Sequence, residues 1–356
     1  MSASVTAGLL DLVRKLVEIE SPTGDTRELG QFLATRLEDS GGRVTWHGEH
    51  VRADFDGPES PLLLLGHLDT VWERGTLAEQ PFRVAGDRAY GAGICDMKAG
   101  LALGLAAVGR SDGHRRALRV FLSADEEDGS VTAREALAEA ARGAAAAFVL
   151  EPATPAGALK TARSGLARYR LQVRGSSGDA DAAVANAVEE LARQVVDLLE
   201  LEDRERGVLV NVGKIDGGVR ANVVPERAEA LLDVRAAGHA DMAAVEARVL
   251  ARVPHDPSTR VAIVEWYSRP PLEHSEGARR LFERAREHAR VLGFALAETS
   301  SAGGSDGNLV APYGVPVLDG LGAVGGGAHA PDEYVVVSQL EPRAALLARL
   351  LADPGI

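Results

Sequence analysis

Six acidic or imidazole side chains stand at positions where a folded chain could bring them together. Five of them follow short apolar runs, and the sixth lies in a glycine-rich loop. They are His67 and Asp69 after the first run, Glu126 and Glu127 after the second, Glu151 after the third, and Asp96 in the loop. Crowded carboxylates repel one another unless a cation holds them, and a mixed carboxylate and imidazole set suits zinc, manganese or cobalt. The pattern therefore suggests a metal site.

The apolar runs have the length and composition of buried strands. They are Pro61–Leu65, Leu118–Leu122, Ala146–Leu150 and Val315–Leu318, and the helical stretches Ala99–Val108 and Thr132–Ala141 lie between them. Buried strands that alternate with helices predict an α/β fold with a mainly parallel sheet, whose functional groups gather at the carboxyl ends of the strands. A single acidic residue in that place is usually a helix cap or a solvated loop residue. The residues alone therefore leave both interpretations open.

The pattern changes from about Ser164 onward. The segments there are a strand over Leu166–Val173, a helix over Ala182–Leu199, strands over Val208–Ile215 and Glu229–Val234, a helix over Ala240–Ala251 and a strand over Val261–Trp266. This order is the split βαβ pattern of a small α+β, ferredoxin-like (βαββαβ) domain. We therefore expect a catalytic α/β domain in two parts, residues 1–163 and 269–356, interrupted by an inserted domain over residues 164–268.

The composition of the chain argues against some classes of partner and some locations in the cell. Acidic residues outnumber basic ones, 52 against 39 among 356 residues, so the net charge is −13. This balance makes nucleic acid an unsuitable partner. Apolar runs such as Leu62–Leu65 are far too short to span a bilayer, which argues against a membrane partner. The first residues carry charges inside their apolar stretch, unlike a secretory signal, and the lone Cys95 excludes an internal disulfide, so we expect a cytoplasmic protein.

Several long motifs, in order along nearly the whole chain, resemble one enzyme family. This is the co-catalytic zinc family of bacterial glutamate carboxypeptidase, acetylornithine deacetylase, succinyl-diaminopimelate desuccinylase and aminoacylase. The glutamate carboxypeptidase branch is the nearest. The motifs are GHLDTVWERGTL, PFRVAGDRAYGAGICDMKAG, SADEEDGS, LEPA, GGVRANVVPERAEALLDVR, SRPPL, AGGSDGN and DGLGAVGGGAHAPDEY. The resemblance implies a hydrolase of amide bonds that uses two divalent metal ions, with Zn2+ favoured and Mn2+ or Co2+ as alternatives.

The resemblance also implies a role for each site residue. His67 and Glu151 would hold one metal, and Glu127 and His329 would hold the other. Asp96 would bridge the two metals. Asp69 would bond to the imidazole of His67, and Glu126 would be the general base. His329 stands in a glycine-rich stretch that lets backbone approach a site closely. The remaining histidines have polar neighbours, so we expect them at the surface; they are His47, His50, His114, His239, His255, His274 and His288.

The same comparison assigns contacts to a small substrate with a free carboxylate. Arg269 would pair with that carboxylate, because a guanidinium binds carboxylates in a bidentate manner; an ordinary surface salt bridge is the alternative. Asn222 would reach the substrate from the inserted domain, which serves as a lid and forms a homodimer in this family. Gly303, Gly304 and Ser305 would line the pocket.

One position departs from the family pattern. Family members usually carry a histidine in the inserted domain, which steadies the oxyanion of the tetrahedral intermediate, and here Asp179 stands in its place. Loss of one oxyanion donor typically costs about 100- to 1000-fold in turnover. We therefore expect a specialised glutamate carboxypeptidase-like activity. The alternatives are an N-acyl amino acid deacylase, or a non-hydrolytic biosynthetic enzyme or binding protein that keeps the metals.

Overall fold

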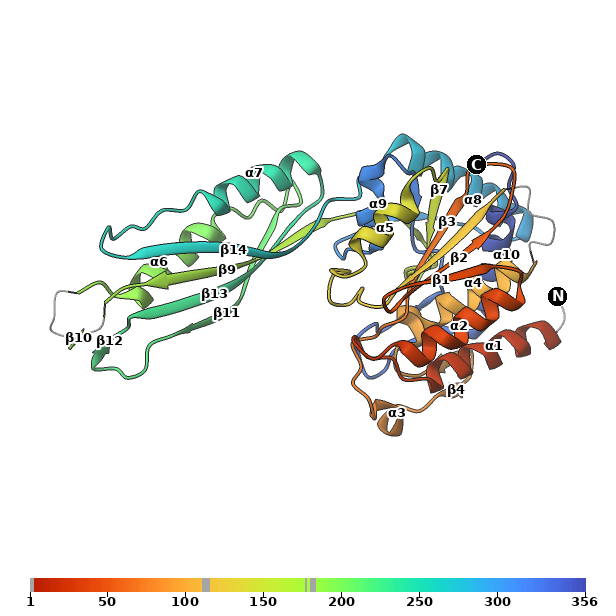
Figure 1. Ribbon diagram of the computed structural model, residues 1–356, viewed down its shortest axis with the longest axis horizontal. Helices are drawn as coiled ribbons and strands as arrows, with labels where there is room; N and C mark the ends of the chain where they lie inside the picture. The colour runs from red at the N-terminus through yellow and green to blue at the C-terminus, as the bar shows by residue number, and fades with distance from the viewer. Residues whose placement is uncertain (1–2, 111–115, 177, 180–183) are drawn as a thin grey trace. The chain divides into compact units, whose positions relative to one another are not determined.

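The computed structural model describes residues 3–110, 116–176, 178–179 and 184–356 (Figure 1). The chain divides into two compact units. Unit 1 consists of Met1–Ala162, His274–Ser300 and Ser305–Ile356, and unit 2 consists of Arg163–Glu273 and Ser301–Gly304. Each unit has its own hydrophobic core. Among the described residues, no helix combines the length and apolar character needed to cross a membrane.

Unit 1 is built on a six-stranded sheet with the order β1-β2-β6-β3-β7-β16. The strands are β1 (Arg43–His47), β2 (His50–Phe55), β3 (Leu62–His67), β6 (Leu118–Ser123), β7 (Ala146–Val149) and β16 (Val317–Leu318). The four strands β6, β3, β7 and β16 run parallel, and β2 alone runs in the opposite direction, antiparallel to both β1 and β6. The predicted α/β fold with a mainly parallel sheet is confirmed. Its parallel strands are buried along almost their whole length because helices cover both faces of the sheet.

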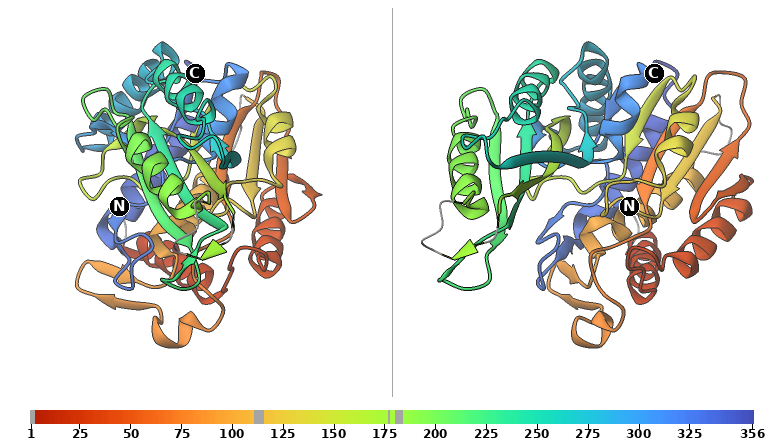
Figure 2. Two further views of the ribbon diagram at one scale, coloured as in Figure 1. Left: turned by 90° about the vertical axis from the view of Figure 1, so that its left-hand side faces the viewer. Right: turned by 60° about the vertical axis from the view of Figure 1, so that its left-hand side comes forward.

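Most helices of unit 1 share one core with the sheet. They are α1 (Ala3–Glu18), α2 (Arg27–Asp39), α4 (Ala99–Arg110), α8 (Glu276–Leu292) and α10 (Val337–Leu351). The short helices α5 (Arg134–Ala141) and α9 (Asp306–Val310) contact β6 and β7 respectively, and they pack on each other (Figures 1 and 2). Two short helical segments, α3 (Thr76–Glu79) and η2 (Ala311–Tyr313), complete the set.

Smaller sheets carry the loops of unit 1. A four-stranded sheet with the order β17-β18-β5-β4 is formed by β4 (Arg83–Ala85), β5 (Arg88–Tyr90), β17 (Gly325–Gly326) and β18 (Tyr334–Val336). A two-stranded sheet pairs β15 (Glu298–Ser301) with β8 (Leu159–Arg163). The turn η1 (Ile94–Lys98) leads directly into α4. The small four-stranded sheet brings residues 325–336 beside residues 83–90, which are distant in sequence.

Unit 2 contains a four-stranded antiparallel sheet with the order β11-β13-β9-β14. Its elements are β9 (Gly165–Arg174), α6 (Ala187–Leu199), β11 (Leu209–Gly217), β13 (Arg227–Ala236), α7 (His239–Leu250) and β14 (Arg260–Arg269). Buried and exposed side chains alternate along β9, and the buried ones lie on the face of the sheet that α6 and α7 cover. A separate two-stranded antiparallel sheet pairs β10 (Gly178–Asp179) with β12 (Val223–Val224).

The start of α6 differs from the expected one. We predicted a helix over Ala182–Leu199, but the helix begins at Ala187. Residues 180–183 lie outside the described residues, and residues 184–186 are not helical. The physical reason is the cap: the Asn186 side chain accepts hydrogen bonds from the N–H groups of Val188 and Glu189, which fixes the first turn after it.

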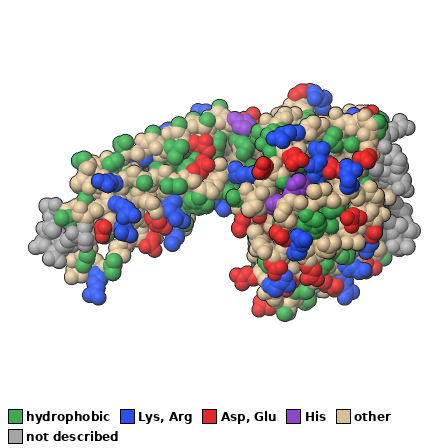
Figure 3. All heavy atoms as spheres, in the orientation of Figure 1, with side chains coloured by type: hydrophobic (Ala, Val, Ile, Leu, Met, Phe, Trp, Pro, Cys, Tyr) green, Lys and Arg blue, Asp and Glu red, His purple; other side chains and the backbone are tan. Residues whose placement is uncertain are grey.

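Side chains of both charges are distributed over the surface. On the face of the molecule that Figure 3 presents, Lys and Arg side chains are interspersed with Asp and Glu side chains. Many of the exposed charges form ion pairs with neighbours of opposite sign, such as Arg279 with Glu276 and Arg14 with Glu18. Such exposed pairs contribute little stability, about 0–1 kcal/mol each.

Two glycines in α4 give a matched test of how closely this helix packs against the chain that follows β7. A Cβ at Gly100 would lie 2.2 Å from the carbonyl oxygen of Leu150, whereas a Cβ at Gly109 meets nothing within 4 Å. We expect Gly100→Ala to lower the free energy of unfolding by about 1–3 kcal/mol, because backbone must move. Gly109→Ala should raise it by roughly 0.5–1 kcal/mol through helix propensity. Urea unfolding measures both, and equal stabilities would contradict the packing described here.

Candidate metal centre

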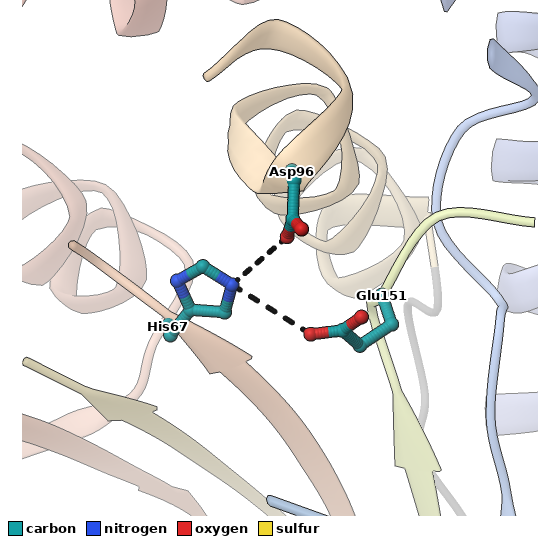
Figure 4. A group of neighbouring side chains, drawn as sticks. All are labelled: His67, Asp96 and Glu151. Atoms are coloured by element: carbon teal, nitrogen blue, oxygen red, sulfur yellow. Dashed lines mark hydrogen bonds and ion pairs between the residues drawn. The ribbon is translucent and has the colours of Figure 1, made fainter. Parts of the chain in front are cut away.

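The first group of clustered side chains lies where two neighbouring parallel strands end. His67 is the last residue of β3, Glu151 follows β7, and Asp96 projects from the turn η1. The Nε2 atom of His67 lies 3.1 Å from Oδ1 of Asp96 and 3.7 Å from Oε1 of Glu151 (Figure 4). One potential ligand atom from each residue lies within 4.8 Å of the other two. The three side chains can therefore hold one metal ion.

The second group shares one member with the first. Nε2 of His329 lies 3.5 Å from Oδ2 of Asp96 and 3.3 Å from Oε2 of Glu127. These three residues also offer ligand atoms within 4.8 Å of one another. Asp96 thus presents Oδ1 toward His67 and Oδ2 toward His329. A carboxylate shared in this way can bridge two cations.

The charges of the two groups fit divalent cations. Burial alone would lower the pKa of His67, but Asp69 and Asp96 outweigh that effect and raise it well above its usual value. Hydrogen bonds to Asp96 and Glu127 raise the pKa of His329 to about 10. Burial raises the pKa of the Glu127 carboxyl group. Positive charge nearby therefore stabilises these carboxylates. A mixed set of imidazole and carboxylate donors suits metals such as zinc, manganese or cobalt.

Asp69 contacts the metal-site residues in two ways. Its backbone carbonyl oxygen lies 2.8 Å from Nδ1 of His67, while its carboxylate Oδ1 lies 3.4 Å from that nitrogen. The carboxylate instead accepts hydrogen bonds from the N–H groups of Glu126 and Glu127, both at 3.1 Å, and from the Thr23 hydroxyl at 2.8 Å. The sequence suggested a bond to the imidazole, and the geometry adds a second role, which is to hold the Glu126–Glu127 turn.

Glu126 and Glu127 are adjacent but lie differently. Glu127 belongs to the second cluster, whereas Glu126 belongs to neither cluster found among the described residues. The Glu126 side chain is buried, and its N–H group is tied to Asp69. The Glu126 backbone is therefore held next to Glu127 by its bond to Asp69.

The prediction that seven histidines lie at the surface is wrong for His50. This residue is only 4% exposed, and its Nδ1 accepts a hydrogen bond from the N–H of Ala124 at 3.0 Å. Its Nε2 lies 3.2 Å from the Thr132 hydroxyl. The imidazole is buried because it fixes both ends of the loop that carries Glu126. His239, His255 and His274 are exposed, His47 and His288 are half-buried, and His114 lies outside the described residues.

Sequence reasoning also missed a cation near the site. Nζ of Lys160, in β8, lies 4.0 Å from Oε2 of Glu151. Its backbone N–H donates to the carbonyl oxygen of Asp319 at 2.9 Å, which fixes the strand. A lysine in a half-exposed strand gives no sequence signal of this kind, because its contact with Glu151 depends on the folded arrangement.

The expected substrate-binding residues are distributed over both units. In unit 2, Arg269 is only 2% exposed, which excludes the alternative of a surface salt bridge. A Cβ at Gly304 would lie 3.2 Å from Cδ of Arg269, so this loop packs against the arginine. The carbonyl oxygens of Gly303 and Gly304 each accept a hydrogen bond from Arg163 at 3.0 Å. Asn222 is exposed in the loop between β11 and β12.

Ser305, in unit 1, caps α9. Its hydroxyl accepts a hydrogen bond from the N–H of Gly307 and donates one to Asp319 at 2.6 Å. Ser305 is fully buried. The side chain therefore supports the loop structurally, and only its backbone remains as a candidate for lining a pocket.

Comparison with known proteins identifies the family of this chain. The chain matches the model of "Peptidase family M20/M25/M40" over residues 63–353. It is 32% identical to carboxypeptidase G2 of Pseudomonas sp. (strain RS-16), over 98% of this chain and 89% of that protein. Its fold is similar to aminopeptidase PepT from Bacillus cereus, with a TM-score of 0.82, 19% identity and 98% of both chains covered. It also resembles YXEP of Bacillus subtilis, described as a dinuclear metal binding peptidase, with a TM-score of 0.72, 16% identity, and 99% and 98% covered.

The ligand set can be tested by metal content. We expect His67→Ala to lose metal, because the imidazole is the only nitrogen donor of the first cluster. His47→Ala, which removes a half-buried histidine of β1, should keep the full complement of the parent protein. Elemental analysis after dialysis measures both variants. Unchanged stoichiometry in the His67 variant would refute the ligand assignment.

Proposed function

Because the chain belongs to peptidase family M20/M25/M40, whose members are metal-dependent hydrolases of amide or peptide bonds, we propose that it cleaves an amide next to a free carboxylate. The observation that carries this proposal is the position of Asp96 between two groups of metal-ligating side chains. A site of this kind supports hydrolysis by an activated water molecule. The resemblance to carboxypeptidase G2 supports a glutamate carboxypeptidase-like activity rather than an aminopeptidase activity.

We propose that His67 and Glu151 would hold one metal ion, that Glu127 and His329 would hold a second, and that Asp96 would be shared between them. Zinc is the first candidate for both ions, and manganese and cobalt are the alternatives. The description of YXEP as a dinuclear metal binding peptidase supports two ions. Two bound divalent cations supply a nucleophile at neutral pH and polarise the scissile carbonyl group. Glu126 takes the proton from the attacking water and delivers it to the departing amine. Asp69 holds the Glu126 backbone in place for this transfer.

The substrate carboxylate would bind to the guanidinium group of Arg269. A planar guanidinium can form two parallel hydrogen bonds to a carboxylate, and a buried one does so with little competition from water. The Gly303–Gly304 loop packs on this side chain and would line the same pocket, together with the backbone of Ser305. Asn222 would contact the substrate from its exposed loop.

Asp179 suggests that the reaction is specialised. Its backbone pairs with that of Val223, the residue after Asn222. An anionic residue here cannot stabilise an oxyanion, but it would attract a cationic group of a substrate. We therefore propose a substrate with a positive charge near the scissile amide. The retained metal ligands also permit a deacylase of N-acyl amino acids, or a non-hydrolytic reaction or binding function.

Unit 2 would serve as a lid and as the interface of a homodimer. The exposed apolar side chains of its elements support this second role, since Val196, Val264 and Trp266 are each about half exposed. Light scattering of the purified protein measures the mass directly. A monomer at all concentrations would refute the dimer.

A conservative substitution tests the general base. Glu126→Gln should keep the parent's metal content and lower turnover by about 100- to 10,000-fold, because an amide cannot accept the proton of the attacking water. Glu127→Gln, the matched change at the next residue, should lower metal content as well, because this side chain belongs to the second cluster. Metal analysis and steady-state kinetics distinguish the two. A Glu126 variant with near-parent turnover would show that another group is the base.

A substrate library tests the proposed reaction. Dipeptides, folate-type glutamates and N-acyl amino acids, some with a cationic group, are incubated with the zinc, manganese and cobalt forms, and products are identified by mass spectrometry. We expect release of an amino acid with a free carboxylate, and the Arg269→Ala variant should raise KM for that substrate. Cleavage restricted to N-acyl amino acids would favour the deacylase. Absence of any hydrolysis, followed by its appearance in Asp179→His, would support the non-hydrolytic alternative.

A further inference from the structure

We propose that Glu333 is a positioning residue of the metal centre, whose carboxylate joins the loop that carries Asp96 to the loop that carries His329. This inference rests on the proposed function only in taking these two residues as metal ligands. Glu333 itself belongs to neither ligand cluster found among the described residues. It acts on the metals through the backbone that holds their ligands.

The carboxylate of Glu333 is surrounded by N–H donors. Oε1 accepts hydrogen bonds from the backbone N–H groups of Cys95 at 2.7 Å and Asp96 at 2.9 Å. Oε2 accepts one from the N–H of Gly93 at 2.8 Å and one from the indole of Trp72 at 3.1 Å. The residue is only 1% exposed. A carboxylate has about four acceptor positions, so these four donors use its full capacity.

The turn that carries Asp96 needs such an acceptor. Asp96 and Met97 have non-helical backbone angles, although they lie within a helical turn that is closed by the bond from the N–H of Lys98 to the carbonyl of Gly93. The N–H groups at positions 93, 95 and 96 lie at the start of this turn, where a helix offers its N–H groups no backbone partner, and all three donate to Glu333. A buried N–H group without a partner costs about 1–3 kcal/mol. Glu333 satisfies all three and fixes the direction of the Asp96 side chain.

The other end of the connection is the His329 loop. Glu333 lies four residues after His329, and its N–H donates to the carbonyl of Ala330 at 3.0 Å. The N–H of Ala330 in turn donates to the carbonyl of Gly327 at 2.8 Å, so the loop is a compact series of turns. One side chain thus connects the shared ligand Asp96 with a ligand of the second cluster. The separation of 3.5 Å between Asp96 Oδ2 and His329 Nε2 depends on this connection.

The charge of Glu333 matters as well as its shape. All four of its partners are N–H donors, so an ionised carboxylate accepts from each of them. The isosteric amide in Glu333→Gln would keep one acceptor oxygen and direct an NH2 group at two of the donors. Opposed donors repel, and the Asp96 turn would shift. Groups that orient metal ligands typically contribute 10- to 100-fold to metal affinity.

Metal affinity distinguishes a positioning role from a merely structural one. We expect Glu333→Gln to raise the dissociation constant of at least one zinc ion by about 10- to 100-fold in competition with a chromophoric chelator. The absorption spectrum of the cobalt-substituted protein should change too. The matched control is Glu341→Gln, which removes another buried carboxylate, one that binds Arg110 through two hydrogen bonds of 2.8 Å. The control should lower thermal stability and leave both zinc constants and the cobalt spectrum unchanged.

The proposal is overturned if the Glu333 variant folds and its two zinc dissociation constants and cobalt spectrum match those of the parent. A variant that does not fold is replaced by a measurement on the metal-free parent. There, hydrogen exchange at the amides of Gly93, Cys95 and Asp96 should be at least ~100-fold slower than in an unstructured chain. Fast exchange at these amides would overturn the proposal. A parent that binds no metal but shows slow exchange would refute the proposed function and leave the Glu333 connection intact.

Discussion

Mutual repulsion of carboxylates is the constraint that shapes unit 1. Asp96 offers ligand atoms within 4.8 Å of Glu151 in one cluster and of Glu127 in the other, and these three side chains are no more than 14% exposed. Like charges at such distances destabilise a fold unless positive charge compensates them. The imidazoles of His67 and His329 provide part of that charge, which is why their pKa values are raised. Two divalent cations would supply it more completely and would give the cluster a chemical use.

Further buried carboxylates fix the loops that carry the candidate ligands, because they accept hydrogen bonds from N–H and O–H groups of those loops. Asp69 accepts from the Glu126–Glu127 turn, as Glu333 does from the Asp96 turn. Asp306, at the start of α9, accepts from the hydroxyl groups of Ser123 at 2.5 Å and of Ser130. Each of these acids immobilises one loop at the carboxyl ends of the strands. The ligands are therefore held by backbone, and a metal ion would meet a largely formed site.

The parts of this account that sequence could predict are those governed by local pattern. β3, β6 and β7 are largely apolar because both faces of the sheet are covered, and the candidate ligands lie at their ends or shortly after them. The hairpin β1–β2 was not predicted, although burial alternates along both of its strands. The burial of His50, the proximity of Lys160 and the four donors around Glu333 were also missed. Each depends on contacts between segments distant in sequence, and their polar neighbours along the chain suggested exposure.

The central claim is that the Asp96 carboxylate lies between two metal ions. Anomalous diffraction from crystals grown with zinc, with data collected on both sides of the zinc absorption edge, tests it most directly. The account predicts two peaks, one near His67 and Glu151 and one near Glu127 and His329, with one oxygen of Asp96 bound to each ion. A single peak, or two peaks remote from Asp96, would contradict it.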